Sequence, residues 1–333
     1  IESGGNYNTV VGDEAGTALT TGDGNVAVGF EALKTEDANG ESTAIGYQAL
    51  KTQNAGISGL NVAVGYKAGA AVTTGTINTL IGALAGDALT TGNSNVAVGH
   101  TALSADTLGD RNVAIGNNAL AQQNFTSSTD SYNVAIGYVA GGSVSTGVQN
   151  TLIGGLAGDA ITTGYYNTAL GKDALGTNTL SSLNVAIGHS ALKTMSAGNA
   201  ETHNVAVGAN AGLSVTTGTL NTLIGGNAGD AITTGASNVA VGYQALSDNT
   251  SGSDNTAIGE LAMENNTTGI RNTAVGSSAL FTKTTGNDNT AIGNGAMFAT
   301  TTASNNTAVG YQSLTANTTG TRMTSVGSRS GMQ

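Results

Sequence analysis

The chain has 333 residues, of which 51 are Gly and none is Pro, Cys or Trp, and charged residues make up only 9% of it. Its 21 acidic and 10 basic residues give a net charge of −11, which argues against nucleic acid or an anionic membrane as a partner, because both attract clustered Lys and Arg. The lack of Cys excludes disulfides and thiolate metal sites, and no apolar run approaches the length of a membrane span.

A five-residue pattern recurs along the whole chain, and we number its first residue position 1. It occurs 19 times, first at residues 8–12 and last at residues 323–327. Successive copies follow a 17-residue period, which lengthens only after the copies that begin at Ser42, Asn112 and Asn184. Position 1 is Asn except at Ser42 and Met323, position 2 is Thr or Val, and position 4 is Val, Ile or Leu. Position 5 is always a glycine, predicted to form a structural corner: Gly12, Gly29, Gly46, Gly65, Gly82, Gly99, Gly116, Gly137, Gly154, Gly171, Gly188, Gly208, Gly225, Gly242, Gly259, Gly276, Gly293, Gly310 and Gly327.

A longer rhythm overlies the 17-residue repeat. Position 3 is usually Ala but is bulky in every fourth copy up to the thirteenth, at Val10, Leu80, Leu152 and Leu223. Each of these copies carries Ala-Gly at positions 8 and 9, and the longer spacings recur in the same phase. We therefore expect one continuous repeat domain over residues 1–333, with four-coil super-repeats starting at about residues 8, 78, 150 and 221 and plain repeats over 289–333.

Each copy is expected to form one coil of a solenoid. Positions 2–4 place β-branched residues at alternate places, which predicts a short strand. The invariant Gly at position 5 would end the strand, because it permits positive φ or close approach of a neighbouring backbone. A Thr-Thr-Gly at positions 13–15, such as residues 90–92, predicts a second turn, and a second short strand or arm carrying Ala-Leu would lie between the two turns.

A coil this small cannot bury its apolar residues alone, so the copies must stack. Parallel strands about 4.8 Å apart would then form ladders of identical side chains, with Val and Ile inside and Asn and Thr at corners. The sequence predicts an all-β fold, a parallel β-solenoid (β-roll) of about 19 coils with nearest-neighbour contacts only. Because the strand has two small or apolar faces, its pattern leaves open which face is the interior.

A flat stripe of Ala, Gly and periodic Leu is expected on one face of the strand. Such a stripe is unfavourable in water, so we expect it to pack against other copies of the chain around a symmetry axis. A side-by-side homotrimer is the favoured assembly, although the spacing does not determine the number of copies.

The repeats resemble two known families. Asn-Thr-Ala-Ile-Gly at residues 255–259 and 289–293 resembles the head repeats of trimeric autotransporter adhesins, which are stacked β-rolls that bind host surfaces. The fuller Asn-Thr-Ala-Val-Gly-Tyr-Gln-Ser-Leu-x-x-Asn-Thr-Thr-Gly at residues 306–320 is similar to repeats of phage tail-fibre proteins, whose repeat length fits better. The resemblance covers nearly the whole chain and implies a trimeric fibre.

Position 6 carries the strongest hint of a binding surface. Aromatic residues there could stack on sugar rings at one exposed edge, although they could instead pack over the glycine corner or a neighbouring chain. These candidate glycan contacts are Phe30, Tyr47, Tyr66, Tyr138, Tyr243 and Tyr311.

The residues needed for catalysis or metal binding are too dispersed to form a site. His100 and His189 occupy position 6 five coils apart, and Asp87, Asp159 and Asp230 share position 10 at intervals of four coils. We therefore expect no enzyme activity, no cofactor and no metal; a polysaccharide-degrading tailspike would need paired carboxylates within about 10 Å.

The favoured function is a structural, adhesive rod, most simply a phage tail fibre on the virion surface that contacts a host-cell glycan or protein. A bacterial trimeric surface adhesin is the alternative, with extracellular location. Membrane insertion and nucleic-acid binding are not expected. Thr-Thr corners, such as residues 73–74 and 216–217, raise ice binding as a remote alternative, although longer spacings interrupt the array.

Overall fold

The computed structural model describes residues 5–38, 40–282 and 285–331, and it divides into two compact units, Ile1–Tyr166 and Asn167–Gln333. The described residues contain strands and turns but no helix. Nineteen strands occupy positions 2–4 of the successive repeats, nine in the first unit and ten in the second. The prediction of a parallel β-solenoid of about 19 coils is therefore confirmed.

The strands of the first unit are three residues long in every coil. They are β1 (Thr9–Val11), β2 (Val26–Val28), β3 (Thr43–Ile45), β4 (Val62–Val64), β5 (Thr79–Ile81), β6 (Val96–Val98), β8 (Val113–Ile115), β10 (Val134–Ile136) and β11 (Thr151–Ile153). Two further strands, β7 (Gly109–Asp110) and β9 (Thr129–Asp130), pair with each other; β9 lies in the longer spacing after Asn112, and β7 lies in the coil before it.

The second unit repeats the same three-residue strand. Its strands are β12 (Thr168–Leu170), β13 (Val185–Ile187), β14 (Val205–Val207), β15 (Thr222–Ile224), β16 (Val239–Val241), β17 (Thr256–Ile258), β18 (Thr273–Val275), β19 (Thr290–Ile292), β20 (Thr307–Val309) and β21 (Thr324–Val326). A single parallel bridge, Ser182 to Glu201, marks the longer spacing after Asn184.

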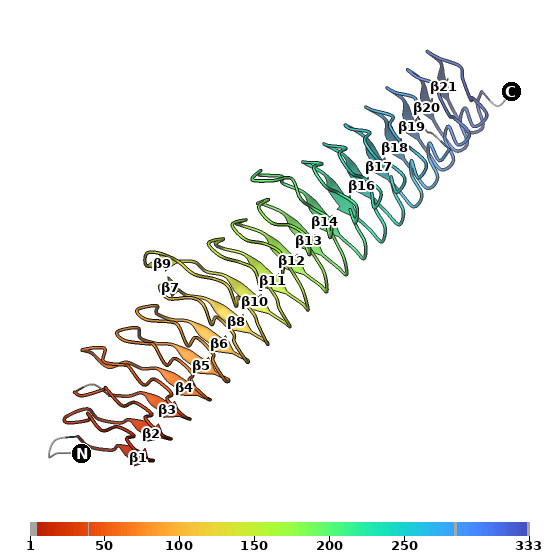
Figure 1. Cartoon of the computed structure of the whole chain (residues 1–333). Coiled ribbons are helices and arrows are strands. Elements are labelled where there is room, and N and C mark those ends of the chain that lie inside the picture. The colour runs from red at the N-terminus through yellow and green to blue at the C-terminus, as the bar shows by residue number, and fades with distance from the viewer. Residues whose placement is uncertain (1–4, 39, 283–284, 332–333) are drawn as a thin grey trace. The chain divides into compact units, whose positions relative to one another are not determined.

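Each strand pairs in parallel with the same strand of the next coil, without a shift of register (Figure 1). Ala27 lies opposite Ala44, for example, and Val28 lies opposite Ile45. The ladder runs from β1 to β11 in the first unit and from β12 to β21 in the second. Identical positions therefore form continuous columns within each unit.

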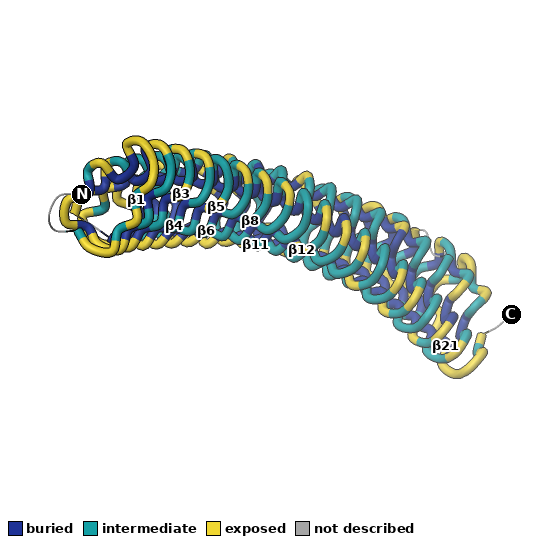
Figure 2. The backbone as a smooth tube through the Cα atoms, turned by 90° about the horizontal axis from the view of Figure 1, so that it is seen from below, coloured by how far each residue is buried: buried dark blue, intermediate teal, exposed yellow. Residues whose placement is uncertain are grey.

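Position 3 faces the interior of the coil. Ala27 and Ala44 are fully buried, together with Ala32 and Leu33 of positions 8 and 9, whereas Ile45 of position 4 is 38% exposed. Figure 2 shows buried residues recurring at the same places from coil to coil. The expectation that Val and Ile fill the interior is wrong, and so is the expectation that the Ala and Gly stripe contacts other copies. A 17-residue coil is narrow, so a Leu at position 9 leaves room only for Ala opposite it.

In every fourth coil up to the thirteenth, the large interior side chain is at position 3, and the facing position 9 is a glycine. Leu80 at position 3 is fully buried, and the adjoining position 9 residues are Gly69 and Gly86. A Cβ added at Gly69 would lie 2.6 Å from Leu80 Cδ1, and one added at Gly86 would lie 2.8 Å from Leu80 Cδ2. Most coils pair Ala at position 3 with Leu or Met at position 9. The coil of Leu80 reverses this arrangement, and Leu80 also fills the space beside Gly69 of the preceding coil. The arm that carries positions 8 and 9 is built of turns and contains no strand.

The buried Asn of position 1 closes each coil and ties it to the next. Asn61 Nδ2 donates to the carbonyl oxygen of Gly75, 14 residues later, at 2.8 Å. Asn61 Oδ1 accepts a hydrogen bond from the backbone N–H of Asn78 in the following coil, also at 2.8 Å. Asn thereby satisfies a buried donor and a buried acceptor with one side chain, which explains why position 1 is so uniform.

Candidate glycan-contact surface

Position 6 lies outside the coil, directly after the corner glycine. Three of the predicted aromatic residues, Phe30, Tyr47 and Tyr66, occupy successive coils of the first unit and form a stack. The ring centroids are 5.3 Å apart in both pairs, with interplanar angles of 20° and 11°. We call these three residues the aromatic ladder. The register of the strands produces it, because each coil places position 6 directly beside position 6 of the next.

Stacking changes what the aromatic ladder can bind. The rings cover one another's faces, so the ladder presents mainly ring edges and the two tyrosine hydroxyls to solvent. The outer face of Tyr66 is also occupied, because Lys67 Nζ lies 5.5 Å from its ring centroid. Sugar stacking on a free ring face, the interaction that the sequence suggested, is therefore restricted here, and edge contacts and hydrogen bonds from the hydroxyls are what the ladder offers.

The other three predicted aromatic residues do not join the ladder. Tyr138 lies in the first unit, and Tyr243 and Tyr311 lie in the second; all three are exposed. The Tyr243 ring covers Gly226, because a Cβ added at that glycine would lie 3.5 Å from Tyr243 Cδ2. Arg329 lies 5.6 Å from the Tyr311 ring centroid. The six residues thus form one cluster of three and three separate positions.

An ion-pair network lies beside the aromatic ladder, at position 7 and beyond. Lys34 Nζ and Lys51 Nζ each lie 2.6 Å from a carboxylate oxygen of Glu31, and Lys34 also pairs with Glu14. Hydrogen bonds from Lys34, then Lys51 and Gln48, lower the pKa of Glu31 to about 2. The charges here are mutually neutralised, so the network does not define an anionic or cationic ligand site.

The Thr-Thr corners use half of their hydroxyls internally. Thr73 Oγ1 donates to the carbonyl oxygen of Thr90 at 3.1 Å, and Thr216 Oγ1 donates to that of Thr233 at 3.1 Å. The second threonine of each pair, such as Thr217, is exposed. The hydroxyls of the first column therefore bond the backbone of the next coil, whereas the second column is exposed.

Several acids have a raised pKa. Burial raises the pKa of Asp87 in the first unit. In the second unit burial, and after it the charge of Asp248, raises the pKa of Asp230 and of Glu264. Within the described part of the chain, no group of three or more His, Cys, Asp or Glu side chains could hold a metal ion. The same residues include no helix long and apolar enough to cross a membrane.

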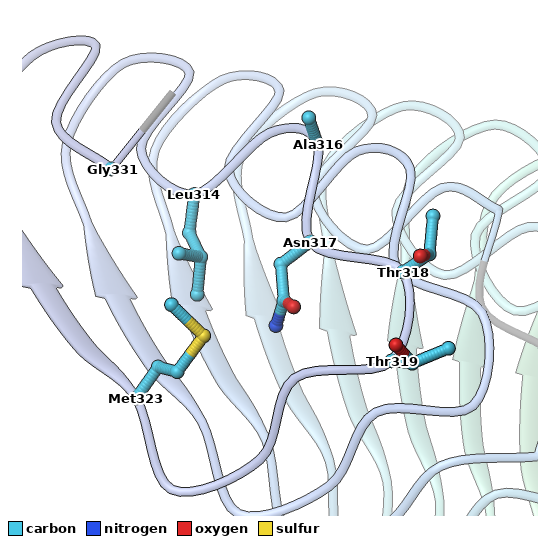
Figure 3. A pocket seen from close by; sticks show the side chains of 7 residues that line it. All are labelled: Leu314, Ala316, Asn317, Thr318, Thr319, Met323 and Gly331. Carbon is cyan, nitrogen blue, oxygen red and sulfur yellow. The ribbon is translucent and has the colours of Figure 1, made fainter. Parts of the chain in front are cut away.

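A cavity of about 420 Å³ lies at the last described coil. Figure 3 shows its lining, with the side chains of Leu314 and Met323 pointing toward each other. These side chains occupy interior columns that the next coil covers elsewhere in the stack. The cavity is therefore the open end of the interior, and it has no ring of converging polar groups that would define a ligand site.

Two aromatic residues outside position 6 were missed by the sequence analysis. Phe281 and Phe298, both at position 10, stack with centroids 5.0 Å apart and an interplanar angle of 5°. Their separation by a single repeat is the signal that could have found them, because any two residues one repeat apart become neighbours.

Comparison with known proteins adds no further identification. The chain matches no model of a protein family, and a search of curated proteins finds no match.

Proposed function

We propose that this chain is a structural and adhesive fibre segment, most simply part of a phage tail fibre at the virion surface. The observation that carries the proposal is the outward strand face, which consists of positions 2 and 4. In each of the 19 repeat strands, position 4 is Val, Ile or Leu and position 2 is Thr or Val. Neither column contains a charged residue. A continuous apolar face of this kind favours burial against another surface.

The occupant that we propose for the strand face is a second and third copy of the same chain. In-register columns make the face uniform along each unit, so identical copies can pack side by side around an axis without a change of register. Three copies agree with the resemblance to trimeric fibre repeats. Lateral burial of these columns would supply stiffness, and the turns on the opposite side would stay available for a host-cell glycan or protein.

The experiment that tests this proposal is the mass of the native particle in solution, measured by light scattering and by native mass spectrometry. The monomer is 32.5 kDa, so a particle of three times that mass is the expected result. A monomer at micromolar concentration would contradict the trimeric fibre.

A bacterial surface adhesin is the alternative, and it would rest on the same apolar strand face and the same trimeric packing. Gold-labelled antibodies raised against the chain distinguish the two proposals by electron microscopy. Label on virions supports the tail fibre, and label on a bacterial surface supports the adhesin.

Ice binding is a second candidate of a different class. It is favoured by the in-register Thr columns at position 2, which are unbroken from β17 to β21. A monomer would leave this flat face in water, and thermal hysteresis at high protein concentration would then be the test.

A further inference from the structure

The second unit contains a notch in its outer surface where one side chain is missing from a column. Position 7 holds Ser278, Gly295 and Gln312 in three successive coils. All three have positive φ, at 54°, 63° and 50°, so the backbone is the same and only the side chain at Gly295 is absent. A Cβ added there would meet only Gln312 Cγ, at 3.4 Å.

One wall of the notch is a partly exposed aromatic ring that stacks with another ring on one face. Phe281 covers one face of Phe298, whereas the next coil places Thr315, not a ring, at the same position. Phe298 is 38% exposed, and it lines a cavity of about 260 Å³ together with Ser278, Asn294, Gly295, Gln312 and Thr315. This arrangement differs from the aromatic ladder, in which the ring faces cover one another.

The rim of the notch is polar and uncharged. The backbone there is already satisfied: Gln312 N–H donates to the Asn294 carbonyl at 2.9 Å, and Gly295 N–H donates to the Ser277 carbonyl at 3.0 Å. Among the described residues, the side-chain amides of Asn294 and Gln312 make no hydrogen bond. Donors and acceptors are thus available around an apolar wall.

We propose that this notch binds one neutral pyranose ring of a glycan. The C–H face of a pyranose is apolar and suits the exposed part of the Phe298 ring, and its hydroxyls suit amide and hydroxyl partners on the rim. Because no charged side chain lines the cavity, the site favours neutral sugars over sialic or uronic acids. The proposal deepens the host-contact part of the proposed function by giving it a location, but its test does not depend on the oligomeric state.

The test is saturation-transfer NMR of the full chain with methyl glycosides of glucose, galactose, mannose and N-acetylglucosamine, and with the methyl glycoside of N-acetylneuraminic acid as the charged comparison. Gly295→Gln fills the notch, and the fold tolerates it because Gln48, Gln244 and Gln312 occupy the same position with φ between 50° and 56°. Phe298→Thr removes the wall and copies Thr315. Asn227→Gln, at position 7 of another coil in the same unit, is the matched control.

Transfer to at least one neutral glycoside is expected, with affinity about tenfold weaker in both notch variants and unchanged in the control. Transfer to none of the four neutral sugars from a folded chain, preference for the charged sugar, or binding that survives Gly295→Gln would each overturn the proposal. A monomeric chain that binds sugar at the notch would retain this inference while the trimeric fibre failed.

Discussion

Gly46 shows why position 5 admits no side chain. Its φ is +134°, and a Cβ added there would lie 2.3 Å from the carbonyl oxygen of Gly65 in the next coil. Gly46→Ala would therefore force two backbones apart as well as strain its own, and we expect it to lower the free energy of unfolding by more than about 3 kcal/mol. Chemical unfolding of variants in the same oligomeric state measures this cost.

Gly56 supplies the matched control for that prediction. Its φ is +69°, but nothing lies within 4 Å of an added Cβ. Gly56→Ala should cost only about 1 kcal/mol, the penalty of a left-handed backbone for a residue with a side chain. Equal costs at the two positions would mean that the contact between coils does not determine the invariance of position 5.

At the scale of the element, the interior exchange between positions 3 and 9 is testable by combined variants. Leu152 is fully buried, and a Cβ added at Gly158 would lie 2.7 Å from Leu152 Cδ2. Leu152→Ala should cost about 2–5 kcal/mol by leaving a cavity. An added Cβ at Gly158 would also lie 2.8 Å from Ile161 Cδ1, at position 12. Adding Gly158→Leu and Ile161→Met to Leu152→Ala copies the coil of Leu192 and Met195, in which Leu192 holds position 9 with a φ of 48°. We expect the triple variant to recover at least half of the loss, and additive losses would contradict the exchange.

A second interior column, at position 12, carries polar groups that the sequence analysis overlooked. Asp106 is fully buried; its Oδ1 accepts from Gly109 N–H at 3.0 Å, and its Oδ2 accepts from Gln123 Nε2 at 2.7 Å. Gln123 Oε1 in turn accepts from Asn133 Nδ2 at 2.8 Å. Burial raises the pKa of Asp106 above its ordinary value of 3.8, despite these hydrogen bonds.

The raised pKa of Asp106 predicts a pH dependence of stability. Because the folded chain holds the proton more tightly than the unfolded chain, this group favours folding below about pH 4, and the benefit is lost as the pH rises through the folded-state pKa. Asp106→Asn combined with Gln123→Met copies the pair Asn178 and Met195, which occupies the same positions in the next super-repeat. The wild type should lose thermal stability from pH 4 to pH 7 by several degrees more than this variant does. Identical pH profiles would show that Asp106 does not titrate as its burial implies.

The repeat made the strands, the corner glycines and the parallel stacking predictable, because a 17-residue period places like residues side by side. It did not determine which strand face is inside. Ala at position 3 and Val or Ile at position 4 are both apolar, and the choice depends on the width of the coil, which a single repeat does not reveal. The column at position 12 was visible in principle, since Glu36 with Gln53 and Asp106 with Gln123 repeat the same pair.

The candidate site was less predictable than the fold. Position 6 was found from residue type, but whether a ring face stays free depends on its neighbours in both adjacent coils. Phe298 stacks with Phe281 alone, because Thr315 and not a ring follows it, whereas Tyr47 is covered by Phe30 and Tyr66. Comparing the residues at one position in successive coils would have distinguished the ring stacked on one face from the ring stacked on both.

At the scale of the whole molecule, the outward strand face is the surface that the proposed trimer would bury. Ile45 in the first unit and Ile258 in the second are 38% and 40% exposed, yet they belong to columns without any charged residue. Position 3 of the same strands is buried, so a substitution at position 4 changes the surface and leaves the interior intact.

Ile45→Lys and Ile258→Lys, made separately, should therefore convert the particle from three copies to one without loss of the β-sheet circular dichroism. In a side-by-side trimer each lysine would be buried unpaired near two others, a cost of several kcal/mol per assembly. Thr217→Lys, at an exposed corner, is the control and should leave the native mass unchanged. A trimer that persists in both isoleucine variants would place the contact between copies on another face, and disruption by only one variant would assign the contact to the unit that carries it.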